Sequence, residues 1–205
     1  MPPSSGPPGL RHRAGRRILG IDPGSVITGW GIVQAAGDSL NHVACGTIAT
    51  LGTQAQGARL SRIYRGIQQI ITRYHPDGVS VEKVFFARNA QSALKLGQAR
   101  GVALLAAAEK ELDVYEYSSN EIKSAVVGYG HASKAQVQSM VTSLLHVCEK
   151  VAADAADALA AAICHLHCES FRARILEAAQ DGDPVIRRRK SSLAGKSGRP
   201  VRDES

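Results

Sequence analysis

Aromatic residues are scarce in this chain of 205 residues, at 4% of the sequence, although 44% of its residues are hydrophobic. Ala, Val, Leu and Ile side chains must therefore fill most of the core. The longest apolar runs, residues 102–108 and 158–164, fall far short of the ~20 residues that a helix needs to cross a bilayer. The N-terminus carries arginines but lacks the apolar stretch of a signal peptide. We therefore expect neither a membrane span nor a secretion signal.

Cysteine is also sparse. Cys45, Cys148, Cys164 and Cys168 lie in apolar or helical stretches, which predicts reduced thiols and a cytoplasmic location. The segment Cys164–Cys168 reads Cys-His-Leu-His-Cys and resembles a set of zinc ligands. A single helix cannot arrange four ligands tetrahedrally around one ion, so we do not expect structural zinc.

No strong excess of charge lies in the central part of the chain. Residues 16–177 hold 16 basic and 14 acidic side chains, so most of the net charge of +7 belongs to the terminal segments. A basic tail attracts phosphate in a salt-sensitive way, but such tails also occur on proteins that bind no nucleic acid. Charge alone therefore does not identify a partner.

The pattern along the chain predicts one α/β domain over residues 16–179. Residues 1–15 and the basic residues 180–205 are predicted to be disordered tails. Short turns join three predicted strands into an antiparallel meander, and helices then alternate with strands. Strands are predicted at residues 17–22, 27–35, 40–49, 78–82 and 114–117, and helices at 59–74, 89–112, 119–127, 133–145 and 154–179. This order predicts a mixed five-stranded sheet, with three antiparallel and then helix-linked strands, flanked by helices on both faces.

Acidic side chains stand at the ends of two predicted apolar strands. Asp22 ends the first strand, and Glu82 ends the fourth. An ionised carboxylate in an apolar strand needs a partner to neutralise it. For Asp22 that partner is either a metal ion or the tight turn that it makes with Pro23 and Gly24, and both interpretations are open.

Two more carboxylates, Asp154 and Asp157, begin the last predicted helix. Residues three apart share a helical face, and the dipole at a helix N-terminus favours negative charge, so the pair could also serve the helix alone. Four carboxylates gathered at one spot repel each other unless cations bind. Carboxylate oxygens suit Mg²⁺, and two ions about 3.5–4 Å apart can activate water against a phosphodiester. The sequence therefore predicts a magnesium-dependent phosphodiester hydrolase.

Several motifs occur together in a fixed order: Gly20–Ser25, Thr28–Gly31, Glu82–Phe85, Asn89–Gly101, Val126–Gly128 and Asp154–Ala160. From about Arg17 to His167 they resemble the RuvC family of bacterial Holliday junction resolvases, within the ribonuclease H-like superfamily. The resemblance implies a ribonuclease H-like fold. It also implies an endonuclease that resolves four-way DNA junctions in recombination and repair by paired symmetric nicks.

The resemblance implies a role for seven residues. The catalytic, metal-binding residues are Asp22, Glu82, Asp154 and Asp157, holding two ions of Mg²⁺ with Mn²⁺ as a substitute, and the DNA-binding residues are Phe85, Lys123 and Lys134. The two lysines are expected at backbone phosphates, although both could be ordinary surface charges. Phe85 is expected against bases at the junction centre, while Phe86 points to the opposite side of an extended segment.

Family resemblance also implies a homodimer, which suits a substrate with near two-fold symmetry, and partnership with the RuvA–RuvB branch-migration complex. Gly97 and Gly101, four apart on a predicted helix, are expected to allow close packing of that helix against another element.

Parts of the sequence are also compatible with three alternative functions. Another ribonuclease H-like nuclease, acting on RNA or other branched DNA, is the main competitor. A non-catalytic junction-binding relative is disfavoured because all four carboxylates are present. Asp22–Gly31 also resembles the phosphate-binding hairpin of actin-like and sugar-kinase ATPases, but the chain is too short for their two domains.

Overall fold

The computed structural model describes residues 15–83 and 90–180. Within the described residues, internal packing separates a first unit, residues 15–168, from a second unit, residues 169–180. The described part of the second unit is the last stretch of helix α5 (Ala153–Gln180). Within the described ranges, no helix is long and apolar enough to cross a membrane.

The elements follow the predicted order of three strands and then helices alternating with strands. The strands are β1 (Arg17–Asp22), β2 (Ile27–Ala36), β3 (Ser39–Ala49), β4 (Gly78–Glu82) and β5 (Val114–Tyr117), and the other helices are α1 (Gln56–Tyr74), α2 (Ala90–Ala108), α3 (Ser119–Val127) and α4 (Lys134–Leu144). The strand order in the sheet is β3-β2-β1-β4-β5. Strands β1, β2 and β3 pair antiparallel, whereas β4 runs parallel to β1 and to β5. The predicted mixed five-stranded sheet is confirmed.

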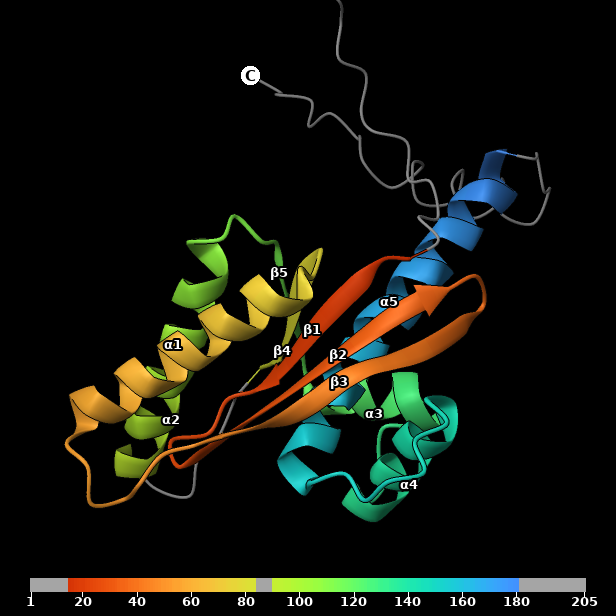
Figure 1. The fold of residues 1–205 in the computed structure, drawn as a ribbon. Coiled ribbons are helices and arrows are strands. Elements are labelled where there is room, and N and C mark those ends of the chain that lie inside the picture. The colour runs from red at the N-terminus through yellow and green to blue at the C-terminus, as the bar shows by residue number, and fades with distance from the viewer. Residues whose placement is uncertain (1–14, 84–89, 181–205) are drawn as a thin grey trace, which may run out of the picture. The chain divides into compact units, whose positions relative to one another are not determined.

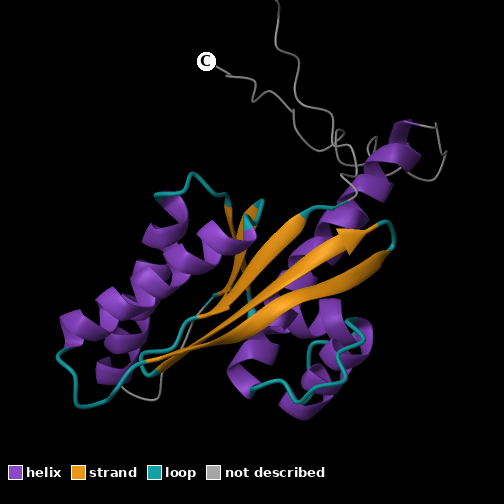
Figure 2. Ribbon diagram, viewed as in Figure 1, coloured by secondary structure: helices purple, strands orange, loops and turns teal. Residues whose placement is uncertain are grey.

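Helices cover both faces of the sheet (Figures 1 and 2). One face packs against α1 and α2, and the other packs against α3, α4 and the first part of α5. Successive side chains of β1 alternate between these two cores, as the pleat of a strand requires. Leu19 and Ile21 lie in the core with α1 and α2, whereas Ile18 lies in the core with α5. Asp22 therefore faces the same side as α5.

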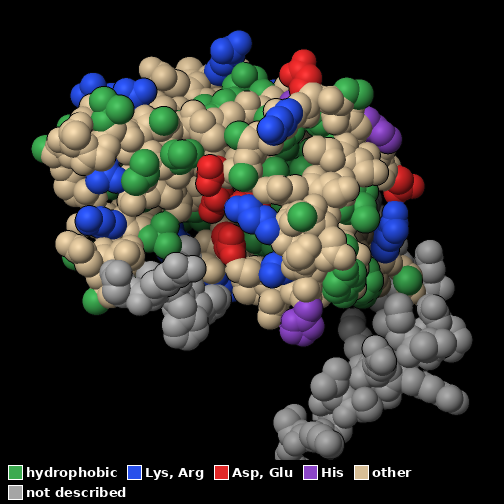
Figure 3. Space-filling model, turned by 90° about the horizontal axis from the view of Figure 1, so that it is seen from below, with side chains coloured by type: hydrophobic (Ala, Val, Ile, Leu, Met, Phe, Trp, Pro, Cys, Tyr) green, Lys and Arg blue, Asp and Glu red, His purple; other side chains and the backbone are tan. Residues whose placement is uncertain are grey.

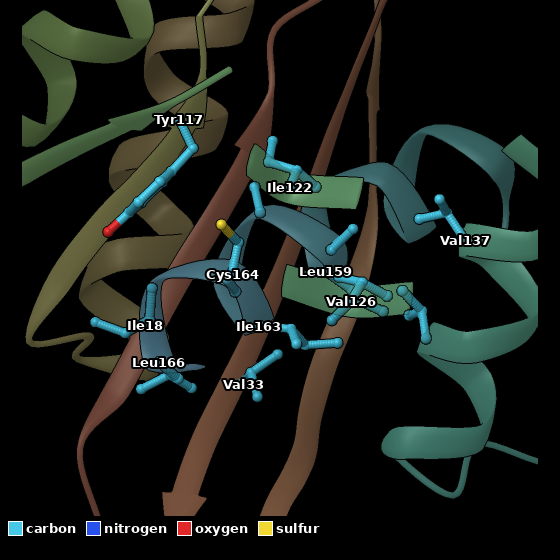
Figure 4. Packing of buried hydrophobic residues seen from close by; sticks show 14 of the residues in the cluster. Ile18, Val33, Tyr117, Ile122, Val126, Val137, Leu159, Ile163, Cys164 and Leu166 are labelled. Carbon is cyan, nitrogen blue, oxygen red and sulfur yellow. The ribbon is translucent and has the colours of Figure 1, made fainter. Parts of the chain in front are cut away.

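The core beside α5 is built largely from aliphatic side chains, as the low aromatic content predicts. Figure 4 shows Ile163 and Leu166 of α5 next to Ile18 and Val33 of the sheet. Tyr117 at the end of β5 also belongs to this core, and its hydroxyl lies 2.8 Å from Nδ1 of the buried His165. All four cysteines carry free thiols.

Helix α2 ends at Ala108, before the predicted end at Leu112. The N–H of Leu112 donates to the carbonyl of Ala107, and the N–H of Glu111 donates to that of Ala108. Glu111 has a φ of 54°, so these bonds close the helix as a Schellman-type turn. Leu112 still packs against the core, which is why its apolar spacing suggested a longer helix.

The prediction that Gly97 and Gly101 allow close packing is wrong for the described residues. A Cβ atom built on either glycine would meet no described atom within 4 Å. The close approach lies instead between α5 and the sheet. A Cβ on Gly20 would stand 1.8 Å from the carbonyl oxygen of Ala158, and one on Gly29 would stand 1.9 Å from that of Asp154. The α5 backbone therefore rests directly on β1 and β2.

Candidate active site

Two of the predicted carboxylates lie at adjacent strand ends. Strands β1 and β4 run parallel, and Ile21 of β1 pairs with Val81 of β4. Asp22 and Glu82 are the next residues of the two strands, so they emerge at the same edge of the sheet. The side chain of Ser80, on the same face of β4 as Glu82, donates a 2.7 Å hydrogen bond to the carbonyl of Ala161 on α5. Both carboxylates therefore face the layer of α5.

Gly29 connects the strand carboxylates to the start of α5. Gly29 is the partner of Asp22 across the β1–β2 pair. The backbone of Asp154 lies against it, so close that a Cβ atom at Gly29 would overlap the Asp154 carbonyl group. Because position 29 has no side chain, the first turn of α5 can approach Asp22. Asp157 follows three residues later on the same helix.

The electrostatics of Asp22 show that the other three carboxylates lie close enough to act on it. The pKa of Asp22 is raised from its ordinary value of 3.8 to about 7. Burial makes the largest contribution, and the negative charges of Asp157, Glu82 and Asp154 raise it further in that order. Among the described residues, the positive charge of Lys134 opposes this shift. The folded chain therefore brings the four predicted catalytic residues into one electrostatic cluster.

Lys134, predicted to contact DNA phosphate, lies within this acidic cluster. It is the first residue of α4, and its ammonium group forms a 2.5 Å ion pair with Oδ2 of Asp157. Its pKa is raised, mainly by that hydrogen bond, and the charges of Asp22 and Asp154 contribute as well. Its side chain is 60% exposed, so solvent reaches the ammonium group even in the ion pair. Figure 3 shows a face on which acidic side chains lie beside basic ones near the centre.

The other two predicted DNA contacts are not placed in the cluster. Lys123 lies on α3 and is half-buried, and no hydrogen bond or ion pair joins it to the four carboxylates within the described residues. Phe85 lies outside the described residues.

A hydrogen bond from Ser119 to Glu82 was not predicted from the sequence. The hydroxyl of Ser119, the first residue of α3, donates to Oε1 of Glu82. The two residues are far apart along the chain, and serine is common at helix starts, so no sequence signal distinguished Ser119 from its neighbours.

Arg59 is a second unpredicted residue near the site. It is buried, and its guanidinium donates to the carbonyl of Ser25 in the turn after Asp22 and to the hydroxyl of Thr50, the latter at 3.3 Å. A sequence signal did exist in this case. Arg59 stands four residues before Ile63, on the apolar face of α1, where a charged residue must find internal partners.

The donor set suits a hard divalent cation, because all four ligands would be carboxylate oxygens. Burial first, and then the neighbouring negative charges, raise the pKa of Asp22, and a bound cation would relieve the repulsion between those charges. In the described ranges, no three His, Cys, Asp or Glu side chains already converge on one point that could hold an ion. Asp157 is paired with the Lys134 ammonium group, so ion binding at Asp157 requires side-chain rotation there.

The sequence matches the family model described as "Crossover junction endodeoxyribonuclease RuvC" over residues 18–165. The protein of that name from Geobacter sulfurreducens is 55% identical over 149 residues, which cover 73% of this chain and 91% of the relative.

Solved structures share the fold. The Thermus thermophilus RuvC in complex with a Holliday junction substrate aligns with a TM-score of 0.73 and 32% identity, covering 77% of this chain and 97% of that one. The yeast mitochondrial Holliday junction resolvase Ydc2, at 15% identity and a TM-score of 0.58, covers 76% of this chain and 79% of its own, and it shares the fold alone. The ribonuclease H-like fold class predicted from the sequence is thereby confirmed.

Proposed function

Because the chain belongs to the family of crossover junction endodeoxyribonucleases described as RuvC, we propose that it resolves Holliday junctions by paired symmetric nicks. Such a reaction serves homologous recombination and DNA repair. One observation carries the proposal: burial and the nearby charges of Asp157, Glu82 and Asp154 raise the pKa of Asp22, at one edge of the sheet, to about 7. The junction bound to the Thermus thermophilus relative supports this substrate class.

The family is one of metal-dependent nucleases. We assign the four carboxylates as the residues that hold two Mg²⁺ ions, with Mn²⁺ able to substitute. When bound, such ions supply Lewis acidity at the phosphodiester and stabilise negative charge on the attacking and leaving oxygens. Asp22 and Glu82 hold their positions through the β1–β4 register, whereas Asp154 and Asp157 depend on the contact between α5 and Gly29.

The basic residues have separate proposed roles. Lys134 is paired with Asp157 but is exposed enough to turn its ammonium group to a DNA phosphate, which would leave the Asp157 carboxylate to hold a divalent cation. Lys123 on α3 is assigned to a second phosphate, and Phe85 to stacking on a base at the junction centre. Exchange of either lysine for Met should weaken junction binding and reduce its salt dependence; unchanged binding would remove that lysine from the interface.

The assembly follows from the substrate. We propose a homodimer, since two cuts at symmetric positions need two active sites, and sedimentation at a monomer mass would contradict it.

We assign residues 16–179 as the nuclease domain and the flanking segments as tails that add attraction to DNA. Partnership with RuvA–RuvB is testable by co-purification on a junction. The free thiols suit a cytoplasmic location, which fractionation of cells would test.

A cleavage assay tests the main proposal. Purified protein and Mg²⁺ are incubated with a mobile four-way junction, a linear duplex and an RNA–DNA hybrid, and the nicks are mapped. We expect cuts at symmetric positions on two opposing strands of the junction and neither of the other substrates cut. Preferential cutting of the hybrid would instead indicate a nuclease acting on RNA.

The matched variants are Asp157→Asn and Asp38→Asn. The first should abolish cutting while junction binding persists, because a neutral amide keeps the size of the side chain but binds a divalent cation poorly. Asp38 lies exposed in the turn between β2 and β3, at the opposite end of these strands from Asp22, so its variant should cut normally. Wild-type cutting by Asp157→Asn would exclude this residue from the mechanism.

A further inference from the structure

Two neighbouring serines at the start of α3 make different hydrogen bonds. Ser118 is the N-cap: its hydroxyl accepts from the N–H of Glu121, and the Glu121 carboxylate accepts from the N–H of Ser118, which completes a capping box. Ser119 has no part in that box. Its hydroxyl points to Oε1 of Glu82, a residue on another element. Ser118 therefore caps the helix, whereas Ser119 contacts the acidic cluster.

The backbone holds Ser119 in place for this contact. Glu82 pairs with Tyr117 in the parallel β4–β5 ladder, and the N–H of Lys83 donates a 2.7 Å hydrogen bond to the carbonyl of Tyr117. The end of β4 and the start of α3 are therefore tied together two residues before Ser119. Because α3 is closed by its own cap, loss of the Ser119 hydroxyl leaves the helix start intact.

We propose that Ser119 is a positioning residue that orients the Glu82 carboxylate for binding a divalent cation. The proposal rests on the proposed function, which makes Glu82 a metal ligand. A glutamate side chain is long and rotates freely, so an unheld carboxylate must be ordered at the moment of binding. The Ser119 hydroxyl occupies one carboxylate oxygen and directs the group. Hydrogen-bonding partners of metal ligands typically contribute 10–100-fold in metal affinity or activity.

The test measures metal binding directly on the full chain without DNA. Mn²⁺ is titrated into wild type, Ser119→Ala, Ser119→Thr and Ser118→Ala and followed by electron paramagnetic resonance. The Mg²⁺ concentration for half-maximal junction cutting is measured alongside. For Ser119→Ala we expect a Kd for Mn²⁺ about 10-fold higher, a similar rise in the Mg²⁺ requirement and little change in Tm. Ser119→Thr keeps the hydroxyl and should bind Mn²⁺ with an affinity close to that of wild type.

The adjacent variant is the control. Ser118→Ala removes the helix cap, so it should lower Tm while its Kd for Mn²⁺ stays at the wild-type value. Wild-type affinity in Ser119→Ala, or failure of Ser119→Thr to restore a lost affinity, would overturn the positioning role.

Glu82→Gln distinguishes a failure of the proposed function from a failure of the Ser119 role alone. If Glu82→Gln binds Mn²⁺ and cuts like wild type, the proposed function is wrong in making Glu82 a ligand, and the role of Ser119 falls with it. If Glu82→Gln loses affinity while Ser119→Ala does not, only the Ser119 proposal fails.

Discussion

Replacing Gly29 by alanine should separate the acidic cluster with a single methyl group. The new Cβ would stand 1.9 Å from the carbonyl oxygen and 2.3 Å from the carbonyl carbon of Asp154. Real Cβ atoms essentially never lie closer than 3.0 Å, so the start of α5 must retreat by about 1.1 Å, the difference between 3.0 and 1.9 Å. The displaced atoms are backbone atoms of a proposed metal ligand and cannot rotate away.

The expected cost has two parts. Overpacking of this kind destabilises a protein by about 1–3 kcal/mol. At 2–4 °C per kcal/mol for a protein of this size, Tm should fall by roughly 2–12 °C. A 1 Å misplacement of reacting groups costs roughly 100-fold in rate, so junction cutting should fall by about that factor while the protein remains folded.

The assay pairs single-turnover cutting of a four-way junction with thermal melting followed by circular dichroism. Gly57→Ala is the matched control, because Gly57 lies in α1 and a Cβ there would meet nothing within 4 Å. Its cutting should be unchanged, and its stability should rise by about 0.5–1 kcal/mol. Gly31→Ala should be milder than Gly29→Ala, because its Cβ would meet the Leu159 side chain, at 2.6 Å, before any backbone.

Wild-type melting and cutting by Gly29→Ala would contradict this prediction, because α5 would then tolerate a methyl group that the structure excludes. An equal loss of activity in Gly57→Ala would also contradict it, since the loss would then not come from the α5 contact.

Two further predictions concern charge. The pKa of Asp22 is about 7 in the folded chain and 3.8 ordinarily, so between these pH values the folded protein holds a proton on Asp22 that the unfolded chain has lost. In EDTA, the free energy of unfolding of the wild type should therefore fall as pH rises from about 4 to above 7. Asp22→Asn removes this pH-dependent loss of stability. The variant should gain at most ~4 kcal/mol in free energy of unfolding over wild type, and the gain should be larger at pH 8 than at pH 5. An equal gain at both pH values would contradict the prediction. Residues 16–179 alone should cut junctions but bind them with a weaker salt dependence, because residues 178–205 carry seven basic against four acidic side chains; an insoluble or inactive product would contradict the domain limits.

The fold could be predicted from the sequence because its signals are local. Apolar alternation and helical spacing identified the strands and helices of the described residues in order, and most ends agree with the structure within a few residues. The end of α2 did not, because its closing turn depends on the left-handed backbone of Glu111, and a glutamate carries no sign of that conformation. The prediction of close packing at Gly97 and Gly101 was wrong for a related reason. Spacing shows that two glycines share a helical face but not whether anything lies against it.

Residue order alone was enough to identify the residues that could form the acidic cluster. Asp22 and Glu82 end apolar strands, and Asp154 and Asp157 begin a helix with alanines around them, all of which is readable from residue order. How these groups meet depends on the packing of the elements against each other. The parallel β1–β4 register, the contact of α5 with Gly29, the Lys134–Asp157 ion pair and the Ser119–Glu82 hydrogen bond all join residues far apart in the chain. Such contacts, and the buried environment that raises the pKa of Asp22, exist only when separate elements pack together, because burial and electrostatic coupling depend on distance in space.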